Sequence, residues 1–169
     1  MNAQQIMETE EFKKCAEFHG HICPGLAIGY KAAKAAMERL KEIRAEDEEM
    51  VAVVETDACS ADAVQVLTGC TFGKGNFIHK DHGKMVVTLL SRNTGNGVRV
   101  AMRPGSIAPD ETHQALLSRI MNDQADEEDK RRFRELHFKR ACDVLEMSVG
   151  KLFEVRNVNI QVPPRARIE

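Results

Sequence analysis

One helical pattern, which runs from Pro24 to about Glu42, most constrains how this chain can fold. Proline suits the first helical position because its missing N–H would have no partner there. The larger side chains that follow recur every three or four residues and define one apolar helix face, made of Leu26, Tyr30, Ala33, Met37 and Leu40. We therefore expect this helix to be a central element of the core.

Beside the apolar face runs a stripe of small residues, Gly25, Gly29, Ala32 and Ala36. A glycine inside a helix costs up to about 1 kcal/mol, so Gly29 indicates that another element approaches this face closely. We predict that the stripe packs against the sheet or against a symmetry-related helix. A larger side chain would overpack that contact by about 1 to 3 kcal/mol.

The rest of the chain mixes helical and strand patterns that do not strictly alternate. Residues 50–56 predict a buried strand, and segments 77–80, 84–92 and 98–103, separated by turn signals, predict a three-stranded antiparallel meander. Further expected elements are helices over 10–18, 60–67 (capped by Ser60), 109–122 and 126–149, a stop at Gly150 and a strand over 152–162. These patterns predict an α+β fold, a mainly antiparallel sheet packed against helices, in a single domain over 1–169.

Composition excludes several classes of protein. The 169 residues are 43% hydrophobic and 30% charged with a net charge of −2, so no basic excess points to a nucleic-acid partner. The polar, acidic N-terminus is unlike a signal peptide, and no apolar run approaches the roughly 20 residues that a membrane span needs. We expect a cytoplasmic protein. Its five cysteines, an odd number, favour free thiols or metal ligands over a disulfide framework.

The loop before the long helix concentrates chemically active side chains. His19, His21 and Cys23 fall within five positions, and Cys23 precedes a helix N-terminus, where backbone N–H groups favour a thiolate. Imidazole and thiolate are also ligands that zinc prefers. Taken singly, however, the histidines could be ordinary loop residues and Cys23 a small buried hydrophobe.

Two more cysteines lie at comparable places downstream. Cys59 comes just before the helix expected over 60–67, in the same electrostatic setting as Cys23. Cys70 lies in the glycine-rich loop 68–76, whose glycine spacing does not match a phosphate-binding loop. Cys15 and Cys142 fall on apolar helix faces, Cys142 together with Phe138, and are expected in the core.

Three motifs in order resemble those of the FmdE family of formylmethanofuran dehydrogenase proteins. They are His19-Gly20-His21-x-Cys23-Pro24-Gly25-Leu26, Asp57-Ala58-Cys59 with Asp62-Ala63-Val64-Gln65, and Thr68-Gly69-Cys70-Thr71-x-Gly73-Lys74-Gly75-Asn76. The family takes its name from a protein associated with the molybdenum or tungsten enzyme that fixes carbon dioxide onto methanofuran in methanogenesis. The resemblance implies an α+β core, a metal or reactive site built from the His/Cys motifs, homodimers, and a molybdenum or tungsten oxidoreductase as partner. Some members carry a cysteine-rich zinc finger after the core, whereas no cysteine follows Cys142 here.

The residues and the resemblance lead to one principal hypothesis about the site. We predict that His21, Cys23, Cys59 and Cys70 converge on one metal ion, zinc or another soft divalent ion. Asp62, Gln65, Lys74 and Asn76 would then orient ligands or contact a small-molecule substrate. Should the chain be catalytic, Cys59, Asp62 and Lys74 are the expected catalytic residues.

Two alternatives stay open at this point. A metal-free thiol enzyme or redox protein would use Cys59 or Cys70 with His21 or His19 as the base. A purely structural protein would pack its thiols together and have dimerisation as its only activity. Metal content separates the first hypothesis from both alternatives.

Overall fold

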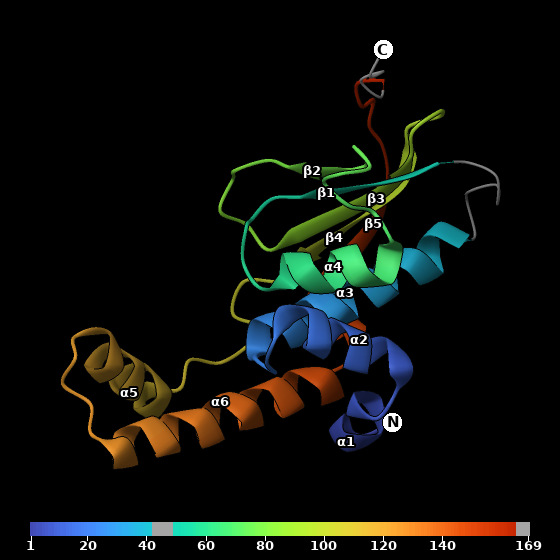
Figure 1. Ribbon diagram of the computed structural model, residues 1–169. Helices are drawn as coiled ribbons and strands as arrows, with labels where there is room; N and C mark the ends of the chain where they lie inside the picture. The colour runs from blue at the N-terminus through green and yellow to red at the C-terminus, as the bar shows by residue number, and fades with distance from the viewer. Residues whose placement is uncertain (42–48, 165–169) are drawn as a thin grey trace.

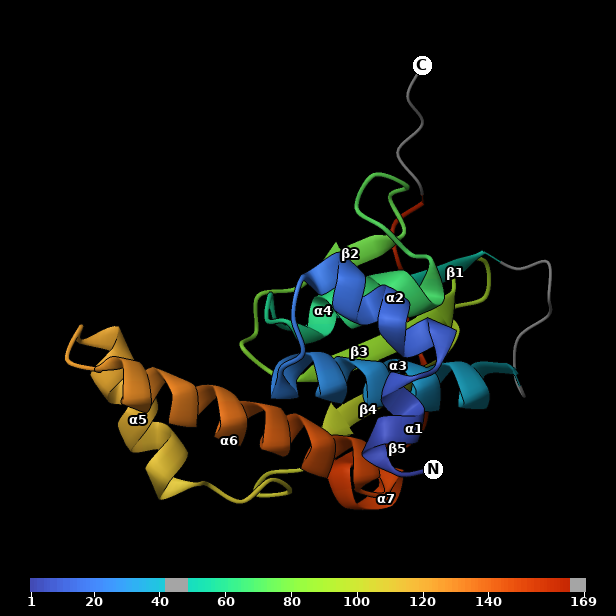
Figure 2. The same cartoon turned by 60° about the horizontal axis from the view of Figure 1, so that its bottom comes forward.

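The long helix expected from Pro24 is α3 (Pro24–Lys41), and it lies between the sheet and the remaining helices (Figures 1 and 2). The computed structural model describes residues 1–41 and 49–164, so the expected helix end near Glu42 lies outside the described residues. The other helices are α1 (Ala3–Met7), α2 (Glu10–His19), α4 (Ser60–Thr68), α5 (Glu111–Met121), α6 (Glu127–Glu146) and α7 (Val149–Leu152). The strands are β1 (Met50–Val54), β2 (Phe77–His79), β3 (Val86–Ser91), β4 (Asn96–Met102) and β5 (Phe153–Asn159).

The strands form one five-stranded sheet in the order β2-β1-β3-β4-β5. All neighbouring pairs are antiparallel except β1 and β2, which are parallel, with Ala52 opposite Phe77. The chain is therefore a single α+β domain with a mostly antiparallel sheet packed against helices, as the sequence predicts.

The expected three-stranded meander is wrong in its first strand. β2 pairs with β1 and not with β3, because α4 carries the chain back across the sheet as the crossover that a parallel pair requires. The following segment then passes the end of β1, where the Lys84 N–H donates to the Glu55 carbonyl at 3.0 Å. The β3–β4 hairpin, by contrast, is confirmed.

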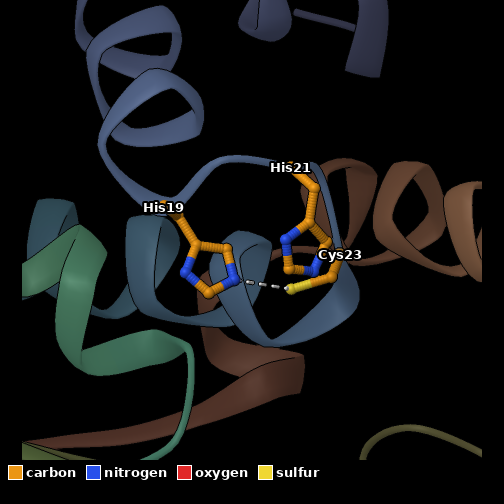
Figure 3. Close-up of side chains that lie close together, drawn as sticks. All are labelled: His19, His21 and Cys23. Carbon is orange, nitrogen blue, oxygen red and sulfur yellow. Dashed lines mark hydrogen bonds between the residues drawn. The ribbon is translucent and has the colours of Figure 1, made fainter.

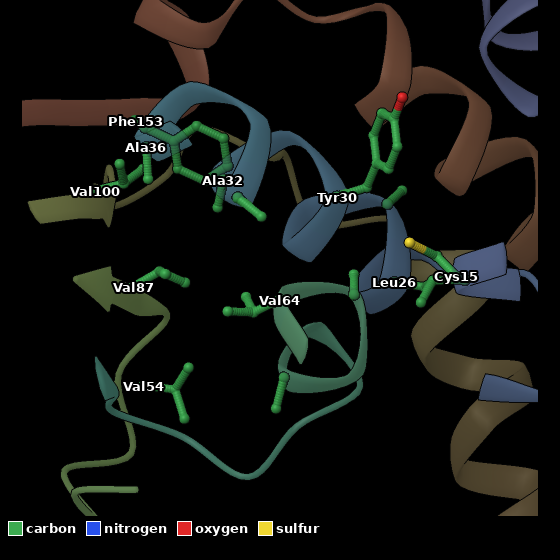
Figure 4. Close-up of a cluster of buried hydrophobic side chains, with 14 of the residues drawn as sticks. Cys15, Leu26, Tyr30, Ala32, Ala36, Val54, Val64, Val87, Val100 and Phe153 are labelled. Atoms are coloured by element: carbon green, nitrogen blue, oxygen red, sulfur yellow. The ribbon is translucent and has the colours of Figure 1, made fainter. Parts of the chain in front are cut away.

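The two faces of the sheet bury different sets of side chains. Because side chains alternate along a strand, Ala52 and Val54 of β1 face the helices, whereas Val51 and Val53 face the other side. On the helical side, Val64 of α4 lies between the sheet and α3 (Figure 4). On the other side, Ile160 and Val162 pack against the smaller cluster. No helix in the described part of the chain is long and apolar enough to cross a membrane.

The close approach predicted at Gly29 is confirmed, and the element that approaches is α4. A Cβ atom added at Gly29 would lie 2.3 Å from the carbonyl oxygen of Ser60 and 2.6 Å from its Cα. Gly29 therefore lets the backbones of α3 and α4 touch, and this contact fixes where Cys59 lies relative to the start of α3.

Three local expectations about helices need correction. Ser60 does not cap α4, because the backbone is already helical at Cys59 and Ser60 is buried inside the first turn. The last long helix ends at Glu146 and not at 149, since Ser148 caps the separate short helix α7, which contains Gly150. Phe138 is 47% exposed, because this part of α6 projects with α5 beyond the body of the domain (Figure 1).

Candidate metal site

The turn between α2 and α3 brings two imidazoles and one thiol together. His19 is the last residue of α2, Gly20 reverses the chain at a φ of 91°, and Cys23 immediately precedes α3. One ligand atom from each of His19, His21 and Cys23 lies within 4.8 Å of the other two (Figure 3). This is the group of possible metal ligands that the described residues contain.

Asp62 of α4 fixes the orientation of His19. The Nδ1–H of His19 donates to Oδ2 of Asp62 at 2.7 Å, since a carboxylate can only accept at this position. The other ring nitrogen, Nε2, is then unprotonated and faces the sulfur of Cys23 at 3.7 Å. A carboxylate that holds a histidine in this way is the usual companion of a metal-binding imidazole.

Cys23 is buried at the start of α3 and accepts a hydrogen bond from the Leu26 N–H at 3.3 Å. The sequence favours a thiolate here, yet burial raises the pKa of the Cys23 thiol more than the backbone N–H groups lower it. The expectation of a ready thiolate is therefore wrong for the metal-free protein. A metal ion would have to displace the thiol proton.

The donor atoms fit a soft divalent ion. Nitrogen and sulfur ligands at about 2.1 and 2.3 Å in a tetrahedron lie about 3.6 Å apart. The observed 3.7 Å between His19 Nε2 and Cys23 Sγ is close to that separation. Three protein ligands would leave a fourth position for water, a substrate or a further thiol, which is the pattern of zinc sites that carry out chemistry.

Cys59 lies beside this group without being a member of it. Its side chain shares a hydrogen bond with that of Cys23. A Cβ atom at Gly25 would lie 3.0 Å from Cys59 Cβ and 3.9 Å from Cys23 Sγ, so the glycine allows the start of α3 to approach Cys59. The structure thus brings together His21, Cys23 and Cys59 from the predicted ligand set, and Asp62 with them through His19.

Cys70 and Lys74 lie in a different environment. Cys70 is buried behind the glycine loop, its sulfur donates to the Met50 carbonyl at 3.4 Å, and burial raises the pKa of its thiol. The Nζ of Lys74 donates to the Gly69 carbonyl at 2.7 Å, and the Asn76 amide oxygen accepts from the Thr71 N–H. Among the described residues these three side chains have their hydrogen bonds within the loop and at β1, and the metal-capable group does not contain Cys70.

His19 is the ligand candidate that the sequence prediction left out of the metal set. Its position one turn before Cys23, at the end of a helix, was the available signal, because a helix end and a tight turn can aim both side chains at one point. The contact with Asp62 was not readable, since it joins residues 43 positions apart.

Two further histidines flank the group from α5 and α6. His113 and His137 stack at a centroid distance of 5.1 Å, and Nε2 of His113 and Nδ1 of His137 share a hydrogen bond of 2.9 Å. Burial lowers the pKa of His137, and the charges of His113 and His21 lower it further. The projecting helices therefore border the exposed side of the candidate site.

The fold and the site define an α+β protein with a His/His/Cys group that could hold a metal ion. Residues 18–154 match the family described as "FmdE, Molybdenum formylmethanofuran dehydrogenase operon", which is most of the chain. The chain therefore belongs to the FmdE family, as its three motifs indicate.

Two relatives add detail. The crystal structure of an FmdE-like protein of tungsten formylmethanofuran dehydrogenase from Syntrophus aciditrophicus is 26% identical, with a TM-score of 0.57 over 94% of this chain and 73% of that one. A protein of Archaeoglobus fulgidus named "Probable S-adenosyl-L-methionine-binding protein" is 34% identical over 167 residues, 95% of this chain. This chain spans 45% of the length of that relative.

Proposed function

We propose that this protein binds one soft divalent metal ion, zinc in the first instance, through His19 Nε2, His21 and Cys23. In this proposal it acts as an accessory protein to a molybdenum or tungsten oxidoreductase of the formylmethanofuran dehydrogenase type. The ion would polarise a bound small molecule or pass to the partner enzyme. Homodimer formation belongs to the same proposal.

One observation carries the metal assignment. Two nitrogens and one sulfur converge on a space that an ion could fill, and Asp62 already holds His19 in the tautomer that a metal needs. A histidine and a cysteine that only filled a turn would not require this carboxylate. The oxidoreductase partner is supported by the family description and by the name of the Syntrophus protein.

Metal content tests the proposal directly. Protein purified without an affinity tag should contain close to one equivalent of zinc or a similar ion by elemental mass spectrometry. Cys23→Ala should lose that metal, whereas Cys142→Ala, whose thiol lies half-buried on α6, should keep it. Metal-free protein that also fails to bind added zinc would contradict the assignment.

A matched pair of histidine variants locates the site. His21→Ala should weaken zinc binding by at least about tenfold, because one of three ligands is lost. His79→Ala, at the exposed end of β2 and outside the group, should bind zinc as the parent does. Equal losses in both variants would indicate a general effect on the fold.

S-adenosyl-L-methionine binding is a second candidate, favoured by the 34% identity to the Archaeoglobus protein over nearly the whole of this chain. Isothermal titration of the ligand into the metal-free and the zinc-loaded protein would test it. Binding to the zinc-loaded form alone would join the two candidates in one site. No heat in either titration would leave metal binding as the function of this half of the relative's length.

A further inference from the structure

Two thiols from separate helix starts meet beside the candidate metal site. Cys23 precedes α3 and Cys59 precedes α4, and their side chains share a hydrogen bond. The approach depends on two glycines, since a Cβ at Gly25 would lie 3.0 Å from Cys59 Cβ and one at Gly29 would lie 2.3 Å from the Ser60 carbonyl oxygen. Neither helix start can retreat without loosening the α3–α4 contact.

We propose that Cys23 and Cys59 form a redox modification site that closes to a disulfide when metal is absent. The disulfide would take from the ion the one sulfur ligand of the His19, His21 and Cys23 group. Oxidation and metal binding therefore exclude each other. This exclusion rests on the proposed metal site, whereas the disulfide itself does not.

The two cysteines differ in exposure, and this difference sets the order of the reaction. Cys59 is partly exposed and Cys23 is 2% exposed, so a small disulfide in solution meets Cys59 first. The Cys59 thiolate attacks one sulfur of that disulfide and releases one small thiol. The Cys23 thiolate then attacks the Cys59 sulfur of the mixed disulfide and releases the second small thiol.

The reaction balances without any other component. Two protein thiols are oxidised to one protein disulfide, and the small disulfide is reduced to two thiols. The two protons lost from Cys23 and Cys59 end on the released thiols. The co-reactant is thus a low-molecular-weight disulfide, for which oxidised glutathione is a suitable probe.

The structure also separates this pair from the other thiols. Cys15 and Cys70 are buried, with 0% and 1% exposure, and Cys142 lies half-buried on α6. Burial raises the pKa of Cys15 to about 11, which keeps that thiol protonated and unreactive at neutral pH. Selective linkage of Cys23 to Cys59 is therefore the expected outcome of mild oxidation.

The test treats the metal-free full chain with oxidised glutathione and maps its disulfides by mass spectrometry without reduction. We expect a Cys23–Cys59 link, loss of zinc binding, and recovery of zinc binding after dithiothreitol. Cys59→Ser should keep its zinc binding through the same treatment, because Cys23 then has no partner thiol. Cys142→Ser should form the link as the parent does.

Zinc should protect the pair. At a free zinc concentration of about one hundred times the Kd, formation of the link should slow about one hundredfold, because only the metal-free fraction reacts. A protein that binds zinc but never forms the link overturns this inference and leaves the proposed metal site standing. A link that leaves zinc binding intact overturns the exclusion and removes Cys23 from the metal site.

Discussion

The Nδ1–H of His19 donates to the carboxylate of Asp62 at 2.7 Å, and this contact joins the end of α2 to the first turn of α4. It connects the first and second sequence motifs of the family. Because Asp62 occupies Nδ1, only Nε2 of His19 can face Cys23. The contact therefore determines both the tautomer and the direction of the proposed ligand.

The first prediction concerns Asp62. Asp62→Ala should weaken zinc binding about 10- to 100-fold, because His19 loses the group that orients it and raises its basicity. A competition titration against a chromophoric chelator measures the change. Asp81→Ala, on an exposed loop away from the group, is the matched control. An unchanged zinc Kd in Asp62→Ala would show that the carboxylate has no part in metal binding.

Gly29 gives a prediction about stability. A methyl group there would meet the Ser60 backbone at 2.3 Å, so Gly29→Ala should lower the free energy of unfolding by about 1 to 3 kcal/mol and Gly29→Leu by more. Urea denaturation checks this. Gly150→Ala, where an added Cβ has no heavy atom within 4 Å, should change stability little. Equal stabilities of the two alanine variants would mean that α3 and α4 do not touch as described.

Periodicity alone predicts α3, the buried strands and the β3–β4 hairpin, because each depends on residues close in sequence. The parallel pairing of β2 with β1 depends on where α4 delivers the chain, and no local pattern carries that information. The end of α6 at Glu146 was missed for a related reason, since a cap at Ser148 competes with the continuing helical pattern.

The site was predicted unevenly for the same physical reasons. His21, Cys23 and Asp62 were recognised from residue type and motif, whereas His19 was recognised in the motif but not assigned as a ligand. Its role depends on a contact with a residue 43 positions away. Burial, which raises the pKa of Cys23 against the effect of the helix start, also follows from packing and not from local sequence.

Association gives a further prediction. The family resemblance implies homodimers, and two-fold closure is the commonest way for a small protein to cover exposed apolar side chains. Met121 and Phe138, on the projecting helices, are 77% and 47% exposed. Sedimentation at micromolar concentration should give about twice the chain mass. A single species at 18.9 kDa over the whole concentration range would refute the dimer.

The last prediction concerns Glu55, at the end of β1 on the side of the sheet away from the helices. Burial by itself would raise the pKa of this carboxyl, but hydrogen bonds from His82 at 3.0 Å and Arg99 at 3.1 Å outweigh it and lower the pKa below 4.5. A carboxyl whose pKa is lower in the folded chain stabilises it above the unfolded pKa, and this contribution is lost as the pH falls through the folded pKa.

The parent should therefore be more stable than Glu55→Gln near neutral pH, and the difference should shrink as the pH falls below about 4.5. Urea denaturation of both proteins at a series of pH values measures the difference. Glu17→Gln, an exposed carboxylate on α2, serves as the control and should show a smaller difference at every pH. A stability gap between parent and Glu55→Gln that grew toward acid pH would reverse the sign of the linkage and show that burial, not the His82 and Arg99 contacts, controls this carboxyl.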